Sequence, residues 1–137
     1  MRTRSDSELE KLPMRYDPNR QPDSEEWSDL DESERIDLVT DYHRGARIAV
    51  PNLSIHASLH VVVENQILMG DKTPVGATLG RLMAEGLDRH DAIHAIASVL
   101  SGVMFDSVKP QPNADLNAVY FREVAALTAA RWRSQAE

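Results

Sequence analysis

The sequence predicts an all-α protein, a small bundle of about five helices with a polar N-terminal tail. From Leu30 onward, apolar residues recur at intervals of three and four, which is the period of an α-helix. The periodic stretches are separated by short segments that contain proline, glycine and residues that cap helices. No stretch alternates apolar and polar residues in the way that is typical of a β-strand.

The first two predicted helices cover residues 32–47 and 53–69. Asp31 followed by Glu34 has the spacing of a capping box, in which the two side chains satisfy backbone N–H groups reciprocally. A proline separates the two helices, and Asn52 behind it is a good N-cap for the second.

Three more helices are predicted in the second half of the chain. Thr73 with a proline directly after it indicates the start of the third helix, and Gly86 indicates its end. Asp88 is the predicted N-cap of the fourth helix, residues 89–107, and a proline-containing loop leads to the fifth, residues 114–134.

Residues 1–26 are predicted to be a flexible tail and residues 27–137 a single helical domain. The tail carries three prolines and many charges but no sustained apolar period, so we expect it to bury too little surface to become ordered. Tyr16 and Trp27 are the side chains that could attach parts of it to the domain. A chain of 137 residues fits one compact domain.

The composition excludes several classes of function. The chain has no cysteine, which removes disulfides, thiolate metal sites and a cysteine nucleophile. Its net charge of −7 argues against a nucleic-acid partner. We expect neither a signal peptide nor a membrane span, since the longest uncharged stretch, residues 48–63, contains a proline and two histidines. A cytoplasmic location is therefore expected; a homodimer stays open, and so does the nature of any protein or small-molecule partner.

Four of the five histidines form two pairs with a spacing of four, His56 with His60 and His90 with His94. At this histidine frequency, chance predicts roughly 0.2 such pairs. Each helical residue advances about 100°, so the members of a pair lie within about 40° of each other, and both pairs fall on the apolar face of their helix. Short loops favour antiparallel neighbours, so we expect the second and fourth helices to run parallel and to carry both pairs to the same end.

These four histidines are the predicted ligands of one divalent metal ion. Each buried imidazole needs a partner for both ring nitrogens, and a single ion would satisfy several of them at once. Glu64, at the border of the same face, is a candidate fifth ligand. His43, in the last turns of the first helix, is expected to support the site or to be structural. An all-imidazole site suits zinc, copper, nickel, cobalt or iron, and zinc is the first choice.

The segments "PNLSIHASLHVVVENQ" and "GLDRHDAIHAI" resemble an uncharacterised bacterial family of small proteins of unknown function. Its members carry one HxxxH motif near the start of a helix and a second one further along the chain. The likeness covers residues 35–107, and it implies the same four histidines as a site without implying a reaction. The second motif in that family often reads HExxH, whereas this chain has Asp91 after the first histidine.

The main prediction is a metal-binding protein, and two other functions stay open. One is a metal-dependent hydrolase that uses its HDxxH motif, with Asp91 or Glu64 as the general base. However, Asp91 lies three residues after the predicted cap Asp88, where an acid stabilises the start of a helix. The other is a metal-free interaction module whose histidines are packing or pH-sensing groups.

Overall fold

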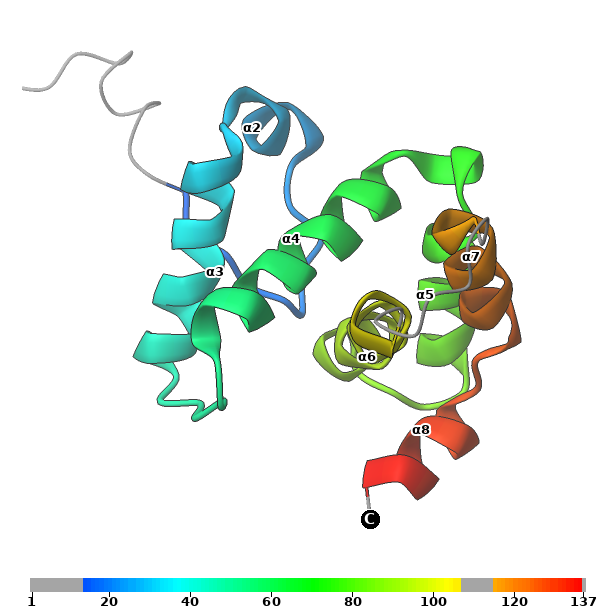
Figure 1. The fold of residues 1–137 in the computed structure, drawn as a ribbon. Helices are drawn as coiled ribbons and strands as arrows, with labels where there is room; N and C mark the ends of the chain where they lie inside the picture. The colour runs from blue at the N-terminus through cyan, green and yellow to red at the C-terminus, as the bar shows by residue number, and fades with distance from the viewer. Residues whose placement is uncertain (1–13, 107–114, 137) are drawn as a thin grey trace, which may run out of the picture.

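The computed structural model describes residues 14–106 and 115–136 of the chain (Figure 1). Every regular element within these ranges is helical, so the prediction of an all-α fold is confirmed. These ranges contain seven α-helices and one short 3-10 turn, rather than about five helices. With the labels of Figure 1, they are α2 (Ser24–Asp29), α3 (Glu32–Gly45), α4 (Leu53–Leu68), η1 (Gly70–Lys72), α5 (Val75–Ala84), α6 (Arg89–Asp106), α7 (Leu116–Ala126) and α8 (Ala129–Ala136).

Three helices begin at the N-caps that the sequence predicted. Asp31 accepts a hydrogen bond of 2.8 Å from the N–H of Glu34, and the N–H of Asp31 donates to the Glu34 side chain at 3.0 Å, which closes the capping box of α3. Asn52 at the start of α4 and Asp88 at the start of α6 each accept from the N–H three residues further on. These bonds satisfy N–H groups that have no partner inside the helix, and they fix where the two helices with histidine pairs begin.

Residues with positive φ end the first and third predicted helices. Gly86, the predicted terminator, follows α5 with a φ of 109°, a conformation that glycine adopts without steric cost. Arg47 has a φ of 57°, which a right-handed helix cannot continue, and α3 stops at Gly45. The first helix is therefore slightly shorter than the predicted range of 32–47.

The prediction of one long helix over residues 114–134 is wrong. The chain leaves the helical conformation at Leu127, which has φ −67° and ψ 138°, and two helices, α7 and α8, lie on either side. Leu127 is buried in the core, and the hydroxyl of Thr128 caps α8 by accepting from the N–H of Arg131 at 3.1 Å. The apolar period alone could not reveal this break, because the kink is stabilised by burial and by a new cap.

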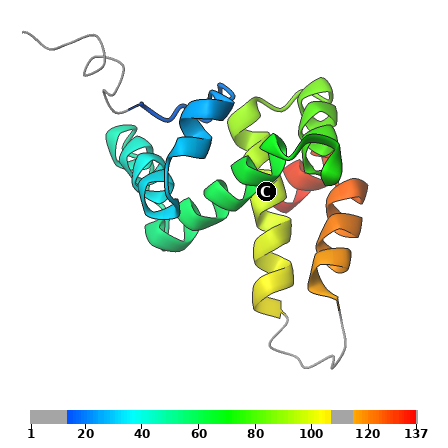
Figure 2. The same ribbon diagram turned by 90° about the horizontal axis from the view of Figure 1, so that it is seen from above.

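Two buried apolar clusters meet on α4. The larger one joins α4, through Val63 and Ile67, to α5, α6, α7 and α8. The smaller one contains Tyr16, Trp27, Val39, Ala57 and Val61. Figures 1 and 2 show the same division, with α2 and α3 on one side of α4 and the remaining helices on the other.

The expected parallel arrangement of the second and fourth predicted helices is wrong. Figure 1 looks along α6 while α4 runs across the view, so these two helices cross at a large angle. His94 of α6 nevertheless contacts both His56 and His60 of α4, so the two histidine pairs still come together. Loop length sets which helices are neighbours, whereas the packing of side-chain ridges sets the angle between them.

Residues 14–26 do not form the flexible tail that the composition predicted, while residues 1–13 lie outside the described ranges. Tyr16 is only 4% exposed and Trp27 is completely buried, with a distance of 6.0 Å between their ring centroids. Trp27 also donates from its indole N–H to the side chain of Asn65 on α4 at 2.8 Å. Two buried aromatic rings provide the apolar contact that offsets the entropy of ordering this segment.

Replacing Tyr16 by alanine should therefore destabilise the protein. The loss of a large buried ring costs about 3–5 kcal/mol in the free energy of unfolding. The neighbouring Arg15 is exposed, so Arg15→Ala in the same segment is the matched control. Urea unfolding followed by circular dichroism measures both variants. Equal stability of the two would mean that this segment does not pack on the helices in solution.

Candidate metal centre

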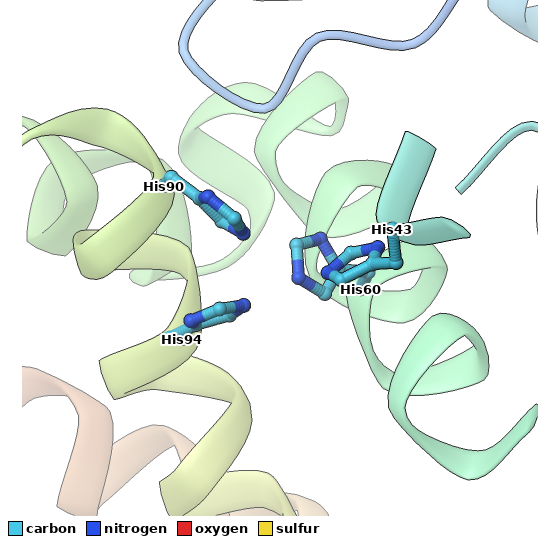
Figure 3. A group of neighbouring side chains, drawn as sticks. All are labelled: His43, His60, His90 and His94. Carbon is cyan, nitrogen blue, oxygen red and sulfur yellow. The ribbon is translucent and has the colours of Figure 1, made fainter. Parts of the chain in front are cut away.

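All five histidines of the chain meet where α3, α4 and α6 come together. His43 lies in the last turn of α3, His56 and His60 lie in the first two turns of α4, and His90 and His94 lie in the first two turns of α6. Figure 3 shows the imidazoles of His90 and His94 pointing from α6 toward those of His43 and His60. The three helix segments thus contribute side chains of one kind to a single small volume.

The nitrogen atoms of this cluster are close enough to share an ion. One ring nitrogen each from His43, His60, His90 and His94 can be chosen so that all four lie within 4.8 Å of one another. His56 is adjacent as well, because its Nε2 lies 3.0 Å from Nε2 of His43 and 3.1 Å from Nε2 of His94. Two nitrogens bound to one ion at about 2.0–2.1 Å lie about 3.3 Å apart in a tetrahedral shell, which is close to these separations.

A hydrogen bond to the backbone shows which ring nitrogen of His43 faces the cluster. Its Nδ1 lies 2.8 Å from the carbonyl oxygen of Val39. A carbonyl oxygen only accepts hydrogen bonds, so Nδ1 carries the proton and Nε2 keeps a free lone pair. Metal-binding histidines are commonly oriented by a bond of this kind from the nitrogen that does not bind the metal.

Two nitrogens in the centre of the cluster are buried without a partner. Within the part of the chain that the structure describes, neither His60 Nε2 nor His90 Nε2 has a hydrogen-bond partner. An unsatisfied polar atom in this position costs about 1–3 kcal/mol, and such atoms are rare in folded proteins. A cation bound between the imidazoles would satisfy both lone pairs, so the residues present fit a metal ion.

The protonation state of the cluster also suits a metal. Burial, assisted by the neighbouring imidazoles, lowers the pKa of His56 to about 4 and that of His94 to about 3. The pKa values of His60 and His90 are lowered too, with burial again as the largest cause. These four imidazoles are therefore neutral at pH 7, which is the form that binds metal ions.

Glu64, the predicted fifth ligand, is engaged elsewhere. Its two carboxylate oxygens accept from the guanidinium of Arg89 at 2.7 and 2.8 Å, and one of them also accepts from the hydroxyl of Tyr16 at 2.5 Å. Burial, followed by the charge of Glu64, raises the pKa of Tyr16, so its hydroxyl remains protonated. The structure thus places Glu64 beside the imidazoles, in a buried ion pair, and not among the atoms that could hold an ion.

Of the four predicted ligands, the structure brings His60, His90 and His94 together in one group. His43 is the fourth member of this group in place of His56, whose Nε2 lies beside it. The sequence assigned His43 only a supporting role, although the predicted first helix already ended near both pairs. Tyr16 and Arg89 were missed as parts of this site. The available signal for Arg89 was its position directly before His90, at the start of the same helix.

Asp91, the candidate base of the HDxxH motif, is exposed on α6. Its backbone N–H donates to the capping side chain of Asp88 at 2.7 Å, as expected for the third residue of a helix. This position agrees with the structural interpretation of Asp91 that the sequence favoured.

No family model matches the chain, and neither the curated proteins nor the solved structures contain a match. None of the described helices combines the length and the apolar character that a bilayer crossing requires.

Asp91→Asn should leave metal content unchanged and lower stability only slightly. An acidic residue in the first turn of a helix contributes about 0.3–1 kcal/mol through the helix dipole. Elemental analysis and urea unfolding of the purified variant measure the two effects. Loss of the metal would show that Asp91 acts on the site and not merely on the helix start.

The metal-free protein should become less stable as the pH falls from about 6.5 toward 4. The folded-state pKa values of His56 and His94 lie below the ordinary value of about 6.5, so within this window the unfolded chain binds more protons than the folded one. Stability therefore rises with pH and is lost on acidification. The urea midpoint of chelator-treated protein should drop between pH 7 and pH 5, and by less in His94→Asn. Equal midpoints at the two pH values would contradict the prediction.

Proposed function

We propose that this chain is a metal-binding protein in which imidazoles from three helices hold one divalent transition-metal ion. The observation that carries the proposal is the pair of buried, unpartnered nitrogens, His60 Nε2 and His90 Nε2. Ring nitrogens of His43 and His94 lie with theirs inside a span of 4.8 Å. His56 is the further imidazole in reach, so the site offers up to five nitrogen donors.

The donor set limits the kind of ion. Neutral imidazoles without thiolates or free carboxylates suit zinc, copper, nickel, cobalt and iron, and they suit calcium or magnesium poorly. Zinc is our first candidate, because four imidazoles complete its preferred tetrahedral shell. A fifth imidazole would equally serve an ion that takes five ligands, so several metals belong in the test.

The ion would act as a cross-link. His43 belongs to the part of the molecule built around the smaller apolar cluster, while His90 and His94 lie on α6, which belongs to the larger one. A metal held by α3, α4 and α6 would join the two clusters, and its binding energy would contribute directly to folding. The two alternatives are less well supported, because Asp91 is exposed, Glu64 is paired, and metal-free packing leaves two buried nitrogens unsatisfied.

Protein prepared without a histidine tag should contain about one metal ion per chain, as a single cross-linking site requires. Chelator treatment should lower the melting temperature of the wild type. His60→Ala and His94→Ala should each weaken zinc binding more than about 100-fold, since losing an outer-shell partner alone already costs about 10–100-fold. Because both residues serve one ion, the double variant should lose much less than the sum of the two single effects.

Asp91→Asn is the control, since it changes an exposed residue on the same helix turn as His90 and His94. Elemental analysis and calorimetric titration with zinc, copper, nickel, cobalt and iron provide the readouts. The proposal fails if the protein binds none of these metals and chelator leaves its melting temperature unchanged. Additive losses in the two single variants would indicate two independent sites instead of one.

A further inference from the structure

A chain of hydrogen bonds leads from the imidazole cluster to the buried ion pair. The hydroxyl of Tyr16 donates to Oε2 of Glu64 at 2.5 Å and lies 3.2 Å from Nδ1 of His60. Arg89 donates to both oxygens of Glu64, from Nη1 at 2.8 Å and from Nη2 at 2.7 Å. Tyr16, Glu64 and Arg89 are all buried, so water does not compete for these bonds.

The direction of each bond follows from the groups involved. Glu64, paired with a guanidinium that stays charged, is an ionised carboxylate and only accepts hydrogen bonds. The single proton of the Tyr16 hydroxyl is used in the shorter bond to Glu64. The oxygen of Tyr16 can then only accept from His60, and so Nδ1 of His60 must be the protonated nitrogen.

We infer that Tyr16 is a positioning residue that holds His60 in the tautomer with its proton on Nδ1, so that Nε2 presents its lone pair to the metal. This inference rests on the proposed function. Hydrogen bonds that orient metal-binding histidines in this way typically contribute a factor of about 10–100 to metal affinity. His60 is thereby held in the same tautomer as His43, whose Nδ1 proton is bound by the carbonyl oxygen of Val39.

The segment that carries Tyr16 is itself anchored at the start of α6. Arg89 donates to the carbonyl oxygen of Pro18 at 3.0 Å, and the backbone N–H of His90 donates to the side chain of Asn19 at 3.1 Å. The Tyr16 ring also packs edge-on against the ring of His60, with 6.0 Å between centroids. These contacts restrict the hydroxyl to one place, which is what a positioning role requires.

The experiment compares Tyr16→Phe with Tyr42→Phe in the full-length protein. Tyr42 also packs against the cluster, edge-on to the rings of His43 and His90, but the described part of the chain shows no hydrogen bond from its hydroxyl. Phenylalanine keeps the ring in both variants, and thermal melts of the metal-free proteins establish that they fold. The probes are zinc affinity and the ¹⁵N chemical shifts of the imidazoles, which distinguish the two tautomers.

In the metal-free wild type, the ¹⁵N shifts of His60 should show a proton on Nδ1. Tyr16→Phe should shift His60 toward a mixture of tautomers and weaken zinc binding about 10–100-fold, whereas Tyr42→Phe should change neither quantity. A merely structural role of Tyr16 would alter the melting temperature without altering the tautomer.

Two results would overturn the inference while leaving the proposed function intact. One is a wild-type His60 with its proton on Nε2 in a protein that binds zinc. The other is unchanged zinc affinity in Tyr16→Phe. A wild type that binds none of zinc, copper, nickel, cobalt and iron would instead overturn the proposed function, and the inference with it.

Discussion

The crowding of neutral imidazole nitrogens in a small buried space is the constraint on which the rest of this structure depends. Nε2 of His56 lies at hydrogen-bonding distance from Nε2 of both His43 and His94. Two further nitrogens of the cluster have no hydrogen-bond partner in the described part of the chain. Lone pairs at such distances repel each other unless a proton or a cation lies between them. A neutral imidazole has only one proton for its two ring nitrogens, and a second proton is unfavourable on His56 and His94, because burial lowers their pKa values. A metal ion bound between the imidazoles would resolve this conflict with one binding event.

The hydrogen bonds around the cluster turn the histidines in the direction that such an ion needs. Val39 holds His43 from the backbone, and Tyr16 connects His60 to the carboxylate of Glu64. The ion pair between Glu64 and Arg89 is buried, and buried ion pairs seldom add net stability over apolar residues of the same size. The pair instead keeps the carboxylate of Glu64, a charged hydrogen-bond acceptor, at a fixed place beside the imidazoles.

Helix α4 carries most of this arrangement. It supplies two of the histidines and Glu64, and its apolar residues enter both core clusters. A change in the position of α4 would therefore alter the site and the packing of both clusters together. In a chain of 137 residues with only 5% aromatic residues, a metal cross-link between the two clusters would contribute substantially to stability.

Helix starts and histidine pairs could be predicted from the sequence because they depend on contacts within four residues. The three predicted caps have their expected bonds, and a spacing of four does place each pair on one helix face. Composition could not predict that the segment around Tyr16 is ordered. This depends on the contact of Tyr16 with α4, more than forty residues away in the sequence. The place of His43 within the group of four imidazoles, and the pairing of Glu64 with Arg89, depend on how α3 and α6 cross α4. Only tertiary structure decided these features, because crossing angles arise from side-chain packing between distant segments, for which a single sequence carries no local signal.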